Sequence, residues 1–258
     1  EGGGHGGSDI AAALEEFAVE ASIAKVMGSE TLDYVLDEDV QIHGGNGFVK
    51  DYPAERSYRD ARVNRIFEGT NAINRMLISG MLIRRALKGE IGLIPAAKRL
   101  QDELLSPSGA SLSTDEGLDA DLRTVGAFKK VALMVLGTAM QTYGSKLSDE
   151  QEVLCAAADI LIDTYAAESA VLRARDAVSS VRSDATLHEA SARTFVNDAT
   201  QRVQASATNA LAAMAEGDTL RTLLAALRRV LKATPVNTVA LRRTLADATV
   251  TRGSYSLS

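Results

Sequence analysis

Apolar residues recur at helical spacing along most of this 258-residue chain, and this pattern constrains its fold more than any other feature. In the stretch 10–42, for example, Leu14, Phe17, Ala21 and Ala24 share one side of an expected helix. The chain has no Trp, four Pro and only 4% aromatic residues, a composition that favours long helices over sheets. The sequence therefore predicts an all-α fold, with a helical bundle followed by an additional helical domain.

Glycine, proline and capping residues indicate where the helices begin and end. The stretch 10–42 is expected to form one helix, or two helices joined near Gly28, and Gly44 with Gly45 ends it because glycine enters the left-handed conformation at little cost. Thr70 is expected to cap the next long helix. The other expected helices are a short one after Pro53 and the ranges 71–88, 95–105, 118–142, 149–181, 184–216, 219–232 and 236–248.

A Ser- and Gly-rich stretch at 106–117, SPSGASLSTDEG, is the clearest linker in the chain. It separates an expected helical domain at 8–105 from an additional helical domain at 118–258. Residues 1–7 are glycine-rich and are expected to be a flexible linker or a cloning scar. Because the sequence does not begin with Met, we expect it to be the C-terminal part of a longer protein. The segment Ser148–Gln151 is interpreted as a capping box.

The net charge of −6 argues against nucleic acid as the main partner, because phosphate binding needs clustered positive charge. Cys155 is the single cysteine, and its apolar neighbours predict a reduced, buried thiol rather than a catalytic one. Three scattered histidines and one cysteine do not predict a metal site. No stretch of the sequence is apolar for long enough to span a bilayer.

Residues 41–75, QIHGGNGFVKDYPAERSYRDARVNRIFEGTNAINR, combine a glycine-rich break, a charge-dense stretch and a Glu-Gly-Thr turn. Their spacing resembles the C-terminal signature of the acyl-CoA dehydrogenases. The segment 66–70, Ile-Phe-Glu-Gly-Thr, resembles the catalytic-base turn of that family. The upstream residues that carry the resemblance are Gln41, Gly44, Gly45, Gly47, Phe48, Asp51, Arg56 and Asp60.

The resemblance implies that Glu68 is the catalytic base. Dehydrogenation of an acyl thioester needs a base for the α proton and an acceptor for the β hydride, and in this family a glutamate and FAD supply them. Gly69 is implied to leave room for the substrate thioester. The implied reaction converts long-chain acyl-CoA to trans-2-enoyl-CoA in fatty acid β-oxidation.

Two opposing effects act on the pKa of Glu68. The adjacent helix start stabilises the carboxylate and lowers its pKa, whereas burial against an acyl chain raises it. We therefore expect Glu68 to become an effective base once bound substrate has expelled water. Without the surrounding motif, Glu68 would be interpreted as an acid that only stabilises the helix start.

The resemblance also implies contacts with FAD. The glycine pair lies against the pyrophosphate side of FAD in the family, often that of the neighbouring subunit, and its alternative role is to turn the chain after a helix. At the position of Ala72, relatives usually have an acidic or amide residue. Alanine cannot make the same side-chain contact with FAD, but its backbone still can. Gln151 matches a glutamine of the very-long-chain branch, and its alternative role lies in the capping box. The full implied set is Gln41, Gly44, Gly45, Thr70, Asn71, Ala72 and Gln151.

The remaining polar residues are expected to be structural. His43, beside the glycine turn, is expected to be packed or hydrogen-bonded, and His188 to be exposed. Charged residues at helical spacing are expected to pair and to position the Glu68 turn, rather than to bind a CoA phosphate. They are Glu55, Arg56, Arg59, Asp60, Arg62 and Arg65.

Residues 118–258 continue beyond the point where most acyl-CoA dehydrogenases end, and they resemble the extra helical domain of the very-long-chain branch. The stretch from Thr219 to Lys232 places leucines on one side and basic residues largely elsewhere. Such a stretch predicts either a helix packed on its own domain or one that contacts an anionic membrane.

The resemblance implies an electron-transfer flavoprotein as partner, a homodimer, and a location in the bacterial cytoplasm or the mitochondrial matrix. Family members also need an N-terminal helical domain and a middle β domain, which this sequence lacks. We therefore expect the fragment alone to be inactive and to bind FAD poorly. Three alternatives remain: a non-catalytic assembly or interaction protein on the same scaffold, an acyl-CoA oxidase, and a plain helical scaffold.

Overall fold

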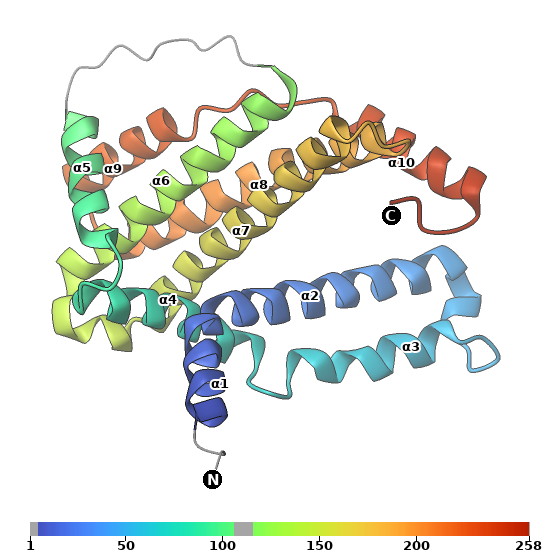
Figure 1. Ribbon diagram of the computed structural model, residues 1–258, viewed down its shortest axis with the longest axis horizontal. Helices are drawn as coiled ribbons and strands as arrows, with labels where there is room; N and C mark the ends of the chain where they lie inside the picture. The colour runs from blue at the N-terminus through green and yellow to red at the C-terminus, as the bar shows by residue number, and fades with distance from the viewer. Residues whose placement is uncertain (1–4, 106–115, 258) are drawn as a thin grey trace. The chain divides into compact units, whose positions relative to one another are not determined.

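The structure is a computed structural model that describes residues 5–105 and 116–257. Regular structure within these ranges is helical throughout, which confirms the predicted all-α fold (Figure 1). None of the helices in these ranges is long and apolar enough to cross a membrane. The helices are α1 (His5–Glu16), α2 (Ala18–His43), α3 (Ala54–Ala61), α4 (Asn71–Leu87), α5 (Leu93–Leu105), α6 (Gly117–Tyr143), α7 (Gln151–Ser179), α8 (Ala185–Met214), α9 (Gly217–Val230) and α10 (Thr238–Arg252), with short 3-10 helices η1 (Gly44–Gly47), η2 (Arg62–Arg65) and η3 (Gly144–Asp149).

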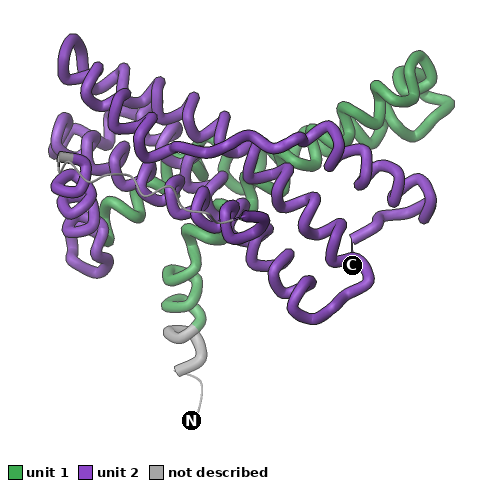
Figure 2. Tube along the Cα trace, turned by 90° about the horizontal axis from the view of Figure 1, so that it is seen from above, with its two compact units in different colours: residues 1–85 green, residues 86–258 purple. Residues whose placement is uncertain are grey.

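Two compact units, residues 1–85 and 86–258, divide the chain within α4 (Figure 2). The sequence assigns α5 to the first domain, whereas in the structure α5 packs against α6 in the second unit. The predicted domains, 8–105 and 118–258, therefore differ from the compact units in the structure, and their limits remain a prediction.

Helix α1 begins at His5, so the structure places residues 5–7 in a helix rather than in the predicted flexible linker. The backbone hydrogen bonds of a helical turn need no side chain. Each glycine reduces the stability of a helix by only about 1 kcal/mol relative to alanine. Residues 1–4 and 106–115, which make up most of the two predicted linkers, lie outside the described residues.

In the first unit, α3 runs back alongside α2 (Figure 1). The predicted stretch 10–42 does form two helices, but they meet at Phe17 rather than near Gly28. Gly28 lies inside α2, where a single glycine is tolerated. As predicted, α2 ends before the glycine pair, and Gly44 has a φ of +57°.

In the second unit, α7 and α8 form the centre and α6 packs against both (Figure 1). Helix α5 contacts α6, α9 contacts α6 and α8, and α10 contacts α8. Alanine and valine fill much of this core, and such small side chains allow close helix packing. The largest fully buried side chains here include Phe128, Leu136, Ile160 and Leu211.

Helix α9 is the predicted amphipathic segment. Leu227, in α9, and Leu231, directly after it, are buried, at 2% and 8% exposed. The helix contacts α6 and α8 of its own unit. The structure therefore favours the interpretation of this stretch as a packed helix over membrane contact.

Two local predictions in the second unit are wrong. The capping box is not formed, because η3 occupies the turn up to Asp149 and the side chain of the N-cap residue, Glu150, makes no capping hydrogen bond. His188 is buried at 5% exposed, with its Nε2 atom 3.4 Å from Asp184 Oδ2. It lies on the side of α8 that packs into the core, four residues before the buried Ala192. Cys155, which the sequence predicts to be buried, is half-buried.

Candidate functional site

Glu68 and Gly69 form a left-handed turn directly before α4. Their φ angles are +53° and +80°. Within the part of the chain that the structure describes, Glu68 and Val181 are the non-glycine residues with positive φ. This conformation costs a non-glycine residue about 1–2 kcal/mol, so neighbouring contacts must hold the turn. The carboxylate of Glu68 is exposed.

The carbonyl oxygen of Gly69 is held by two side chains. Lys25 Nζ donates to it at 2.7 Å from α2, and Asn74 Nδ2 donates at 2.9 Å from α4. A Cβ atom at position 69 would lie 3.0 Å from Asn74 Nδ2. Glycine therefore suits this position for two reasons, its positive φ and the close approach of Asn74.

Thr70 caps α4, as predicted. Its hydroxyl accepts a hydrogen bond from the Ile73 backbone N–H at 3.2 Å. The backbone N–H groups of Asn71 and Ala72, at the helix start, make no hydrogen bond with any other described residue. Together with the positive end of the helix dipole, these two donors suit an anionic or hydrogen-bonding part of a cofactor.

The side chain of Asn71 is buried, at 6% exposed, and links α4 to α2. Its Oδ1 accepts from Lys25 Nζ at 2.7 Å. Its Nδ2 donates to Ser29 Oγ at 3.0 Å and to Glu30 Oε1 at 3.1 Å. These bonds occupy the side-chain amide of Asn71. Any contact of Asn71 with FAD would therefore be made by its backbone N–H group.

Ion pairs between α2 and the segments around the turn complete this network. Arg75 binds both carboxylate oxygens of Glu30, at 2.7 and 2.9 Å, and Arg65 binds Asp33 at 2.6 Å. Burial by itself raises the pKa of Glu30, but hydrogen bonds from Arg75 and Asn71 and the charges of Arg75 and Arg65 outweigh it and hold that pKa below its usual value.

The charge-dense helix α3 forms the predicted ion pairs. Arg56 lies 3.5 Å from Asp60, and Arg59 lies 3.6 Å from Glu55. These pairs are largely exposed, so each contributes little to stability. Among the six charged residues between Glu55 and Arg65 that were predicted to pair, Arg65 of η2 is the one that pairs with α2. Its partner is Asp33, next to the network that holds the turn.

The glycine-rich break lies at the other end of α2 from the Glu68 turn. Gln41 follows Lys25 by sixteen positions on one helix, or about 24 Å at 1.5 Å per residue. Gly44 and Gly45 are exposed, and a Cβ added to either would meet nothing within 4 Å. Their backbone is therefore open to the approach of a phosphate, but the structure does not bring it together with Glu68.

Gly47 is the tightly packed glycine of this break. A Cβ at this position would lie 2.4 Å from the carbonyl oxygen of Val40. His43 is hydrogen-bonded as predicted, with its Nδ1 2.8 Å from the Asp39 carbonyl oxygen, although its side chain remains exposed. The break is thus a turn that only glycine at position 47 can make.

The remaining candidates lie outside this network. Gln151 is the exposed first residue of α7, in the second unit. In the ranges 5–105 and 116–257, no group of His, Cys, Asp and Glu is arranged to hold a metal ion.

Four residues that hold the turn were not predicted from the sequence. Their signal is a polar pattern on two helices: Lys25, Ser29 and Asp33 recur every fourth residue, and Asn71, Asn74 and Arg75 follow helical spacing. Polar residues at these intervals usually indicate a solvated face. The missed residues are Lys25, Ser29, Glu30 and Asn74.

Comparisons with known proteins find matches along most of this chain. Residues 8–83 match a family model described as "Acyl-CoA dehydrogenase, C-terminal domain", and residues 127–229 match a second model with the same description. The chain is 42% identical over 254 residues to a probable acyl-CoA dehydrogenase of Bacillus subtilis. That match covers 97% of this chain and 42% of the relative.

Two further similarities cover most of this chain. The very long-chain specific acyl-CoA dehydrogenase of rat mitochondria is 35% identical over 185 residues, covering 64% of this chain and 28% of that protein. The crystal structure of an acyl-CoA dehydrogenase complexed with FAD, from Bacillus anthracis, superposes with a TM-score of 0.92 at 42% identity, over 96% of this chain and 42% of that one. The chain thus spans less than half the length of these relatives. It belongs to the acyl-CoA dehydrogenase family, and its matches are to the C-terminal part of that family.

Proposed function

We propose that the protein carrying this chain uses FAD to dehydrogenate long-chain acyl-CoA to trans-2-enoyl-CoA, with Glu68 as the base. The Glu68–Gly69 turn is the observation that carries this proposal. It holds an exposed carboxylate at a helix start in a left-handed conformation that two side-chain hydrogen bonds maintain. The similarity to a very long-chain specific relative supports the long acyl chain. Because the chain spans only 42% of the Bacillus subtilis relative, the activity is proposed for the whole protein.

In the proposed reaction, the Glu68 carboxylate removes a proton from the α carbon of the acyl thioester. Bound FAD, held by the backbone of Asn71 and Ala72, would supply the acceptor for the hydride from the β carbon, so that a double bond forms between the α and β carbons. Lys25 and Asn74 hold the turn through the Gly69 carbonyl, which limits movement of the carboxylate. Gly69 itself presents no side chain to the thioester.

Two separate backbone regions of this chain are proposed to contact FAD. Asn71 and Ala72 offer unpaired N–H groups near the base, and Gly44 and Gly45 offer open backbone at the other end of α2. The separation of about 24 Å along the helix suits contacts with two different FAD molecules. We therefore propose a homodimer in which each glycine pair serves the partner's FAD, with an electron-transfer flavoprotein as electron acceptor. Sedimentation of the full-length protein as a monomer at micromolar concentration would contradict the dimer.

The test of this function uses the purified full-length protein with palmitoyl-CoA. We expect mass spectrometry to detect hexadecenoyl-CoA as the product. The rate of its formation should rise when an electron-transfer flavoprotein is added. Rapid peroxide formation from oxygen would instead identify an acyl-CoA oxidase. A protein that binds FAD but leaves every acyl-CoA unchanged would be an assembly protein on the same scaffold.

A further inference from the structure

The second unit contains a pocket that takes no part in the proposed reaction. Helices α5, α6 and α9 form its walls, and its volume is about 390 Å³. That size lies within the usual range for small-molecule sites, roughly 300–1,000 Å³. At one place the α5 and α6 walls approach closely, because a Cβ on Gly137 would lie 3.1 Å from the Ala97 side chain.

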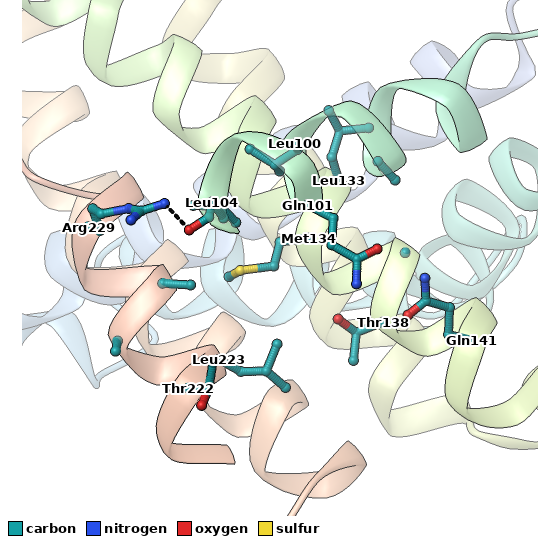
Figure 3. Close-up of a pocket in the computed structure, with 14 residues that line it drawn as sticks. Leu100, Gln101, Leu104, Leu133, Met134, Thr138, Gln141, Thr222, Leu223 and Arg229 are labelled. Atoms are coloured by element: carbon teal, nitrogen blue, oxygen red, sulfur yellow. Dashed lines mark hydrogen bonds between the residues drawn. The ribbon is translucent and has the colours of Figure 1, made fainter. Parts of the chain in front are cut away.

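The floor of the pocket is apolar. Leu100 of α5 and Met134 of α6 are buried, at 5% and 7% exposed, and the half-buried Leu223 of α9 faces them. Figure 3 shows the Met134 and Leu223 side chains extending toward the middle of the pocket. An unbranched hydrocarbon chain would bury apolar surface against this floor.

The polar groups gather at one side of the pocket. Gln101, Thr138 and Gln141 lie near one another there, from α5 and α6 (Figure 3). None of these three side chains hydrogen-bonds to another residue that the structure describes. Two amides and a hydroxyl supply both donors and acceptors, which suits an uncharged, hydrogen-bonding head group.

Among the described residues that line the pocket, Arg229 carries the charge, and it is already engaged. Arg229, on the opposite side in Figure 3, donates to the carbonyl oxygens of Glu103 and Leu104 at the C-terminal end of α5. Its charge therefore offsets the negative end of that helix. Nearby, Glu103 also pairs with Lys130 at 2.6 Å. The Arg229 guanidinium is thus occupied by backbone carbonyls, which leaves it less available to an anionic head group.

We infer that this pocket binds a neutral single-chain amphiphile, such as a monoacylglycerol or a long-chain amide. Its hydrocarbon chain lies on the floor formed by Leu100, Met134 and Leu223. Its head group bonds to Gln101, Thr138 and Gln141. The inference does not depend on the proposed dehydrogenation, because the pocket shares no residue with the Glu68 turn.

Calorimetric titration of the full 258-residue chain with monodecanoylglycerol, below its micelle concentration, tests the inference. We expect saturable binding at one site. Decanoate and decyltrimethylammonium, which share the ten-carbon chain but carry opposite charges, should each bind at least about tenfold more weakly. Absence of saturable monodecanoylglycerol binding, or tighter binding of either charged probe, overturns the inference.

Two variants test the location of the site. Ala226→Phe fills the pocket from α9 and should weaken binding at least about tenfold, whereas Ala212→Phe on the exposed side of α8 should not change it. Replacing Gln101 and Gln141 together by Ala should also weaken binding, and Gln201→Ala is its exposed control. If Ala226→Phe loses helical circular dichroism, Thr138→Leu fills the same space from α6. Unchanged affinity in a folded filled variant contradicts the assignment.

Discussion

Lys25 of α2 donates a 2.7 Å hydrogen bond to the carbonyl oxygen of Gly69, the residue that follows Glu68. The same ammonium group donates to Asn71 Oδ1 at 2.7 Å. One side chain thus joins the long helix α2 to both the left-handed turn and the start of α4. The orientation of Glu68 consequently depends on a residue forty-three positions earlier in the chain.

Lys25→Met should loosen the turn while keeping the length of the side chain. We expect the unfolding free energy of the full-length protein to fall by about 1.5–3 kcal/mol, because two hydrogen bonds from a charged donor are lost. We also expect kcat to fall about tenfold or more, since the base is less well positioned. Urea denaturation and steady-state assays measure these effects. Lys98→Met, an exposed control in α5, should change neither.

Gly47→Ala and Gly45→Ala form a matched pair within one short turn. The Cβ at position 47 would lie 2.4 Å from the Val40 carbonyl oxygen, so the backbone must shift, and we expect a loss of about 2 kcal/mol or more. At position 45 the Cβ meets nothing within 4 Å, and the change should stay within about 0.5 kcal/mol. Equal destabilisation of both variants in urea denaturation would show that the close approach at Gly47 is unimportant.

Gly45→Ala should still affect the full-length protein in a different way. If this glycine approaches the FAD pyrophosphate, the added methyl group should weaken FAD binding without lowering stability. The FAD dissociation constant of the reconstituted protein measures this effect. An unchanged constant would leave Gly45 with only its role in the turn.

Asp121 should make the second unit sensitive to pH. Burial raises the pKa of Asp121 to about 6, against the opposing charge of Arg193, and Glu189 adds to the rise. The folded protein therefore holds an extra proton between about pH 4 and pH 6, and the unfolding free energy falls as the pH rises through this range. Asp121→Asn should remove that fall. Asp119→Asn, an exposed neighbour on α6, should retain it in urea titrations at pH 4, 5, 6 and 7.

The isolated 258-residue chain should bind FAD poorly. Large apolar side chains of the first unit are exposed, among them Ile42 at 82% and Phe48 at 85%, as expected where the remainder of a longer protein would cover them. Gel filtration of the chain with added FAD should separate the flavin absorbance from the protein. Co-elution at one FAD per chain would contradict this expectation.

Local sequence signals predicted much of the fold and part of the site. Thr70 as the cap of α4 and Gly44 at the end of α2 are set by neighbouring residues, so the pattern alone located them. Lys25 and Asn74 could not be found this way, because their importance comes from contact with the carbonyl of Gly69 once the chain has folded. His188 was misplaced for a related reason: its burial depends on which side of α8 packs inward.

The most direct test of Glu68 as the base is anaerobic stopped-flow reduction of bound FAD by palmitoyl-CoA in the full-length protein. Glu68→Gln keeps the shape of the side chain but cannot accept the α proton, so the reduction rate should fall by at least about 100-fold. FAD content and palmitoyl-CoA binding should be retained, and the exposed control Glu90→Gln should reduce FAD at the normal rate. Normal flavin reduction by the Glu68→Gln protein would contradict the proposed role of Glu68.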